Sequence, residues 1–151
     1  MSSAPLDPPE FLVDRSLGSV TVPAAIAKLG YTVHTLESVW GERAERLEDE
    51  EWLERGGHEG WLCLMKDKVR RRPENRSAIE AHGTKGFCIT TGKLTGPEQA
   101  QMFVHNINRI IQAGRKPGPF LYAVYPKTIQ RLFPRPDNPS SRRQTKLKSR
   151  R

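Results

Sequence analysis

Short apolar segments alternate along the chain with longer segments in which apolar and polar positions are mixed. The apolar segments read EFLVD, YTVHT, WLCLM, GFCIT and GPFLYAVYP. Their length and their β-branched and aromatic residues are typical of strands bounded by turns. WLCLM has no polar position, which predicts a central strand buried on both faces of a sheet.

The mixed segments predict helices between these strands. We expect them over residues 21–29, 49–57, 74–81 and 96–113. Thr21 is the expected N-cap of the first helix, with Gly30 just past its end. The last helix should begin at a T-x-x-E capping box, Thr95 to Glu98, and stop at Gly114. A charged loop is expected over residues 36–48, and residues 127–133 could add a short final element.

This alternation of strands and helices predicts a doubly wound, three-layer α/β domain with a mainly parallel sheet. Its first strand, helix and strand form a βαβ unit, for which a right-handed crossover is expected. The length of 151 residues suits one domain, over residues 10–134, after an extended lead-in over residues 1–9. Ligands of such sheets bind at the carboxyl ends of the strands.

Basic residues concentrate at the end of the chain. The whole sequence has a formal net charge of +8. Residues 135–151 hold seven Lys and Arg residues against the single acid Asp137, and therefore most of that charge. This basic tail is expected to be disordered when unbound, and to bind RNA or an acidic partner.

Acidic residues follow two of the predicted strands. Asp14 closes the first strand, and Asp67 lies two residues beyond WLCLM. With about 100° per helical residue, Asp49 shares the inward face of its helix with Trp52 and Leu53. Carboxylates gathered at one edge repel each other unless a cation lies between them. The three aspartates therefore predict a shared site for a hard divalent ion.

Each aspartate also has an ordinary structural interpretation. Asp14 could be a strand-end cap that accepts hydrogen bonds from the amides of Ser16 or Leu17, and Asp49 could be a helix N-cap. Asp67 could be a turn residue paired with Lys66 or Lys68.

Four stretches together resemble the PIN-like domain family, in particular its branch of VapC-type toxin ribonucleases. They are FLVDRSLG, DEEWL, LCLMKDKVRRRPE and PGPFLYAV, and the resemblance covers about residues 10–134. It implies that Asp14, Asp49 and Asp67 hold Mg²⁺ or Mn²⁺ for hydrolysis of RNA, with a cognate antitoxin as partner. In the MKD turn, methionine replaces the usual hydroxyl residue, and the further acid that many members have after Asp67 is missing. Three ligands suit one ion, and Ser16 could position a water.

A basic run beside Asp67 is predicted to bind phosphates that flank the cleaved bond. Its members are Lys66, Lys68, Arg70, Arg71, Arg72 and Arg76. The alternative is a solvated surface without a ligand. Arg15 is expected either to pair with a carboxylate or to contact RNA.

Two other functions fit parts of the sequence. A receiver-like signalling module would use Asp67 as phosphoacceptor with Thr90 or Thr91 and Lys127, although Arg15 stands where it needs a second acid. A non-catalytic nucleic-acid-binding protein would use only the arginine run and the tail. The sequence does not determine the oligomeric state, and a homodimer is possible.

The remaining sequence features argue against other cofactors and compartments. Cys63 and Cys88 are expected to be buried thiols rather than a disulfide. The histidines (His34, His58, His82 and His105) have neither H-x-x-x-H spacing nor a cysteine partner, which disfavours zinc. The chain start resembles no signal peptide and no apolar stretch could span a bilayer, so we expect a cytoplasmic protein without membrane contact.

Overall fold

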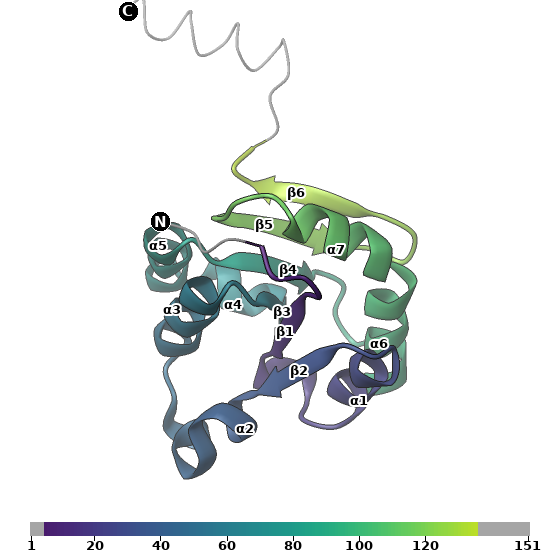
Figure 1. Cartoon of the computed structure of the whole chain (residues 1–151), viewed down its shortest axis with the longest axis horizontal. Helices are drawn as coiled ribbons and strands as arrows, with labels where there is room; N and C mark the ends of the chain where they lie inside the picture. Colours follow the sequence, from purple (N-terminus) through teal and green to yellow (C-terminus); the bar gives the residue numbers. More distant parts are fainter. Residues whose placement is uncertain (1–4, 136–151) are drawn as a thin grey trace, which may run out of the picture.

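A six-stranded sheet with helices on both faces forms the body of the computed structural model, which describes residues 5–135 (Figure 1). The strands are β1 Glu10–Val13, β2 Thr32–Thr35, β3 Leu62–Lys66, β4 Lys85–Ile89, β5 Phe120–Val124 and β6 Ile129–Phe133. Their order is β2-β1-β3-β4-β5-β6; the first five are parallel and β6 is antiparallel to β5. The predicted three-layer, mainly parallel α/β fold is confirmed.

Helices divide between the two faces of this sheet. They are α1 Thr21–Lys28, α2 Leu36–Trp40, α3 Asp49–Glu59, α4 Asp67–Arg71, α5 Pro73–His82, α6 Gly96–His105 and α7 Ile107–Gly114. The 3₁₀ turns are Arg15–Leu17 and Gly41–Arg46. α1, α6 and α7 pack on one face, and α3, α4 and α5 pack on the other (Figure 1). Asp14 directly follows the carboxyl end of β1, and Asp67 directly follows that of β3 as the first residue of α4.

Alternate residues of the central strands supply two separate hydrophobic cores. In β3, Leu62 and Leu64 face one core, whereas Cys63 and Met65 face the other. Cys63 and Cys88 are buried and not joined in a disulfide, as predicted. Burial raises the pKa of Cys63 to about 12 and that of Cys88 to about 11, so both thiols stay protonated at neutral pH.

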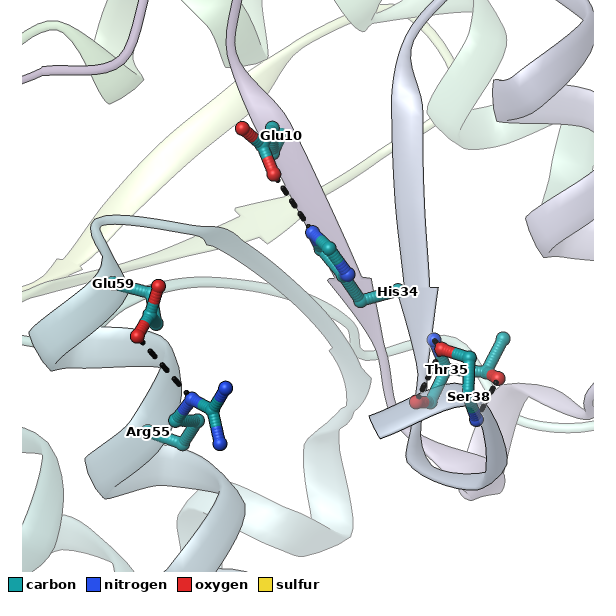
Figure 2. Close-up of polar contacts among 6 residues, drawn as sticks. All are labelled: Glu10, His34, Thr35, Ser38, Arg55 and Glu59. Atoms are coloured by element: carbon teal, nitrogen blue, oxygen red, sulfur yellow. Dashed lines mark hydrogen bonds and ion pairs between the residues drawn. The ribbon is translucent and has the colours of Figure 1, made fainter. Parts of the chain in front are cut away.

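The predicted loop over residues 36–48 is wrong, because α2 and a 3₁₀ turn occupy most of it. A capping box begins α2 (Figure 2): the Ser38 amide donates to Thr35 Oγ1 over 3.1 Å, and the Thr35 amide donates to Ser38 Oγ over 2.9 Å. The third helical residue of such boxes is usually Glu or Gln. Because α2 has serine in that position, the sequence pattern did not indicate the start of this helix.

Two helix boundaries also differ from the prediction. Val20, not Thr21, is the N-cap residue of α1. α3 continues through Gly56 and Gly57 and ends before Gly60, which takes a left-handed conformation.

The predicted helix over residues 96–113 is broken at Asn106 into α6 and α7. The buried Asn106 amide donates to the Met102 carbonyl over 2.9 Å and to the Tyr125 carbonyl over 2.6 Å. Asparagine side chains compete with the helical backbone for hydrogen bonds. The Tyr125 partner lies 19 residues away, beyond the reach of a helical pattern.

A polar pair joins the first two strands (Figure 2). His34 Nε2 of β2 lies 2.8 Å from Glu10 Oε1 of β1, and the His34 ring stacks on Trp61 with 4.0 Å between ring centroids. β2 is an edge strand with mostly half-buried residues. These contacts hold it to β1 and to the residue that precedes β3.

The predicted capping box of α6 is confirmed and allows a stability test. The Glu98 amide donates to Thr95 Oγ1, and the Thr95 amide donates to the Glu98 carboxylate, which lowers the pKa of Glu98. Thr95→Ala should lower the free energy of unfolding by about 1 kcal/mol, measured by urea denaturation. Ser77→Ala, at an exposed position within α5, should not lower it. Equal stability of Thr95→Ala and the wild type would show that the box contributes nothing.

Candidate active site

Asp14 lies at the carboxyl end of β1 and is only 2% exposed. Its Oδ2 accepts a hydrogen bond from the Ser16 amide over 3.1 Å, so the predicted cap interaction is present. Its Oδ1 is buried and accepts no hydrogen bond within residues 5–135. Burial raises the pKa of Asp14, the hydrogen bonds from Ser16 lower it, and the charge of Asp49 raises it further. One carboxylate oxygen is therefore left for a ligand.

Asp49 is the first residue of α3 and is half-buried. The N-cap residue of this helix is Glu48, so the N-cap interpretation of Asp49 is wrong. Asp49 Oδ1 accepts from Trp52 Nε1 over 3.1 Å, and Oδ2 accepts from Asn75 Nδ2 over 2.9 Å. Asn75 also donates to the Val69 carbonyl over 2.8 Å. These donors orient the Asp49 carboxylate.

Asn75 is a residue of the site that was not predicted from the sequence. It is 1% exposed and lies on α5, and its Oδ1 is buried without a hydrogen-bond partner within the described residues. Its contact with Asp49 depends on the packing of α5 against α3. The local pattern around Asn75 predicts only a polar helix, so no sequence signal pointed to this contact.

A hollow of about 300 Å³ brings Asp14 and Asp49 together. It is lined by Asp14, Arg15, Ser16, Leu47, Glu48, Asp49, Lys68, Val69 and Arg72. Glu48 is a third acid here, which sequence reasoning missed because it was assigned to the charged loop. The hollow thus combines three carboxylates with the basic residues Lys68 and Arg72 on its border.

Arg15 holds the two sides of this hollow together. Its Nη1 donates to the Glu45 carbonyl over 2.9 Å, and its Nη2 donates to the Leu47 carbonyl over 2.7 Å. Neither predicted partner, a carboxylate or RNA, is needed to explain its position. Because Arg15 follows Asp14 and Leu47 precedes the start of α3, these bonds keep Asp14 near Asp49.

Asp67 lies outside this hollow, as the first residue of α4 and 8% exposed. Its carboxylate forms ion pairs with Arg70 and with Arg71, the latter over 2.6 Å. The predicted lysine partners are therefore wrong, because residues three and four positions ahead share a helix face with residue i. That pairing could have been predicted had the sequence indicated α4.

Asp67 lines a second hollow of about 240 Å³, which also contains Lys66, Arg71, Thr90 and Thr91. Lys68 lines both hollows, so they are neighbours. Between them, Ser16 Oγ accepts a hydrogen bond of 3.3 Å from the amide of Lys66. The structure thus brings Asp14 and Asp49 into one hollow and places Asp67 in the adjacent one.

The basic run divides between several positions. Lys68 and Arg72 line the hollow of Asp14 and Asp49, and Arg71 lines that of Asp67. Arg70 is paired with Asp67. The Arg76 guanidinium lies 4.5 Å from the centroid of the Phe133 ring and lines neither hollow. The structure does not bring Arg76 to the site.

The acids of the first hollow fit a hard divalent cation. Mg²⁺ and Mn²⁺ prefer oxygen ligands. Asp14 offers a buried oxygen without a hydrogen-bond partner, and Asp49 is near enough to raise its pKa. A cation would compensate the burial and mutual repulsion of these two carboxylates.

Comparison with known proteins identifies the family of this fold and site. Residues 9–91, a range that includes Asp14, Asp49 and Asp67, match the PIN-like domain family. The chain therefore belongs to the PIN-like domain family. PIN nucleases generally use divalent metal ions, in agreement with the acidic hollow.

A relative places the chain within this family. The chain is 32% identical over 123 residues to "Putative ribonuclease VapC45" of Mycobacterium tuberculosis, which covers 80% of this chain and 89% of that protein. It belongs to the VapC-type ribonuclease branch of the PIN-like domain family. No solved structure matches the chain significantly.

The receiver-like alternative is wrong, because the chain belongs to a different family. Among residues 5–135, none of the helices is both long and apolar enough to cross a bilayer.

Proposed function

We propose that this chain is a metal-dependent endoribonuclease, the toxin of a toxin–antitoxin pair, and hydrolyses RNA phosphodiesters at the acidic hollow. The observation that carries the proposal is the buried carboxylate of Asp14, with a free Oδ1, beside Asp49 in a hollow bordered by Lys68 and Arg72. Membership of the PIN-like domain family and the name of the mycobacterial relative support it.

In this proposal Asp14, Asp49 and Asp67 hold Mg²⁺ or Mn²⁺. Asp14 and Asp49 already share one hollow, whereas Asp67 must exchange one of its arginine partners for the cation to become the third ligand. Glu48 lines the same hollow and is an additional candidate ligand. When bound, the cation would supply Lewis-acid activation of water and of the phosphodiester.

The other residues of the site bind and orient the RNA in this proposal. Lys68 and Arg72 bind phosphates that flank the cleaved bond, a role supported by their position on the border of the acidic hollow. Lys66 and Arg71 border the adjacent hollow and extend the basic surface. Ser16 can orient the attacking water, since it lies on the same hollow as Asp14 and Asp49.

The partners follow from the family. A cognate antitoxin would inhibit the enzyme by covering the acidic hollow, which is the opening through which RNA must enter. The basic tail was predicted to be disordered when unbound. Except for Arg135, this tail lies outside the described residues. Binding of RNA or of an acidic partner by this tail, a cytoplasmic location and a homodimer all stay predictions.

Matched variants on one helical turn test the proposed activity. Asp49→Asn should lower the rate of Mg²⁺-stimulated cleavage of single-stranded RNA at least about 100-fold, because it weakens the cation site. Glu50→Gln, an exposed neighbour on the same turn, should stay within about threefold of the wild type. Asp67→Asn should also abolish the stimulated cleavage. Circular dichroism would verify that all three variants are folded.

Two results would contradict the proposal. Cleavage that persists in EDTA or in both aspartate variants would show that the acids are not the active site. RNA that stays intact with the wild-type chain in Mg²⁺ and in Mn²⁺, yet is bound, would favour the non-catalytic nucleic-acid-binding alternative.

A further inference from the structure

Two histidines and a glutamate meet at the ends of α3 and α5. Glu54 and His58 lie one turn apart on α3, and His82 is the last residue of α5. One ligand atom from each residue lies within 4.8 Å of the other two, and His82 Nδ1 is 3.2 Å from His58 Nε2. All three side chains are exposed or half-buried, so an ion from solvent can reach them.

This cluster is separate from the acidic hollow. Asp49 begins α3 beside the hollow, and His58 lies nine residues further along the same helix. At about 1.5 Å per residue, the two positions are roughly 14 Å apart along the helix axis. His82 lies just before β4, at the amino end of that strand. The cluster therefore lies at the opposite edge of the sheet from Asp14.

The distances suit a tetrahedral metal ion. Two ligand nitrogens that are each about 2.0–2.1 Å from Zn²⁺ in tetrahedral geometry are roughly 3.3–3.4 Å from each other. The separation of 3.2 Å between His58 Nε2 and His82 Nδ1 is close to that value. Two imidazoles and one carboxylate form a known zinc ligand set, with a fourth position for water. Mg²⁺ prefers oxygen ligands and is disfavoured here.

The electrostatics of the two helices favour a cation in the same place. His58 lies in the last turn of α3, and His82 lies in the last turn of α5. The carboxyl end of a helix carries partial negative charge from its unpaired carbonyls. The last turns of both helices and the carboxylate of Glu54 therefore lie close together, and their negative charge would stabilise a cation bound between them.

Close packing of α3 on α5 holds the ligands in place. A Cβ atom at Gly57 would lie 2.3 Å from the carbonyl oxygen of His82, so these backbones are in direct contact. Thr84, in the segment between α5 and β4, donates from its Oγ1 to the Leu53 carbonyl over 2.8 Å and joins this segment to α3. His58 and His82 are thus carried on a rigid junction, and little ordering is needed for them to bind an ion together.

We propose that Glu54, His58 and His82 bind a transition-metal ion, Zn²⁺ in the first place, which ties α3 to α5. Zinc was not expected from the sequence, because the histidines have neither H-x-x-x-H spacing nor a cysteine partner. Helix packing instead brings together two histidines 24 positions apart. A bound ion stabilises the same helix pair that carries Asp49 and Asn75 at its other end. It acts on the stability of the fold, whether or not RNA is cleaved.

Zinc titration of the full chain without an affinity tag tests this site. Isothermal titration calorimetry should give one high-affinity zinc per chain. Zinc at about 100 times its Kd should raise the Tm by roughly 5–10 °C. The same binding should occur in Asp14→Asn/Asp49→Asn, where the acidic hollow is disabled. Bound Co²⁺ should show the intense visible absorption of tetrahedral coordination.

Matched variants connect that signal to the three residues. His58→Ala and His82→Ala should each weaken zinc binding at least about tenfold, since one of three protein ligands is lost. Glu54→Gln should weaken binding without changing the Tm of the metal-free protein, because Glu54 is exposed. His105→Ala, a histidine on α6, should bind zinc like the wild type. Absence of zinc binding by the wild type, or unchanged affinity in both histidine variants, would overturn the proposal.

Discussion

Asp14→Asn should lower the rate of Mg²⁺-stimulated RNA cleavage at least about 1000-fold and should stabilise the metal-free protein by about 1 kcal/mol at pH 7. The carboxylate of Asp14 is buried, has a partnerless Oδ1 and lies near Asp49. An amide at this position removes the buried charge and can still accept the hydrogen bond from the Ser16 amide. RNA cleavage assays and urea denaturation in EDTA measure the two effects.

The pH dependence of this stability difference follows from the raised pKa of Asp14. The unfolded chain ionises this group near its ordinary pKa of about 4, whereas the folded chain ionises it only at higher pH. The penalty therefore grows as the pH rises through the folded pKa and is absent below the unfolded pKa. The advantage of Asp14→Asn should be present at pH 7 and disappear near pH 3.

The same variant separates the effect of metal binding on stability from the effect of the buried charge. Mg²⁺ should raise the Tm of the wild type but not of Asp14→Asn, because the cation offsets a charge that the variant lacks. Glu50→Gln serves as the control and should respond to Mg²⁺ like the wild type. A metal-free Asp14→Asn that is less stable than the wild type at pH 7 would contradict this account of the hollow.

Gly57→Ala should destabilise the protein by about 3 kcal/mol, although alanine usually favours a helix over glycine. The new Cβ would lie 2.3 Å from the His82 carbonyl oxygen and 3.1 Å from Thr84 Oγ1. The first of these is backbone, so α3 and α5 would have to separate. Urea denaturation with the wild type as reference measures the loss.

A glycine in open space is the matched control. Gly92→Ala should change the free energy of unfolding by no more than about 0.5 kcal/mol, because nothing lies within 4 Å of its added Cβ. A Gly57→Ala variant as stable as Gly92→Ala would show that the helices are less closely packed than this structure indicates.

Local patterns in the sequence were sufficient to predict the five parallel strands, but not the antiparallel β6 or the order of the strands. The runs EFLVD, WLCLM and GFCIT became β1, β3 and β4, because a fully buried parallel strand needs a continuous apolar segment. The positions of Asp14 and Asp67 followed from the ends of those strands. The helical phase of Asp49 relative to Trp52 also predicted its inward orientation, and Trp52 Nε1 is in fact one of its donors.

Other features of the site depend on contacts between distant segments. Arg15 reaches the backbone 30 and 32 residues ahead, and Asn75 reaches Asp49 across 26 residues. Glu48 enters the hollow because Arg15 holds the segment that precedes α3. Asp67 is different, because its partners Arg70 and Arg71 lie within one helical turn. They were not predicted because the short helix α4 was not predicted.

The sequence was therefore enough for the fold class, the edge of the sheet that carries the acids and two of the residues that meet there. Burial and helical phase are set within a few neighbouring residues, so periodicity reveals them. The partition of Asp14 and Asp67 between two hollows, the donors that orient Asp49 and the meeting of His58 with His82 required tertiary packing. Those contacts join segments that are brought together only when α3 and α5 pack on the sheet, and no local pattern encodes their distances.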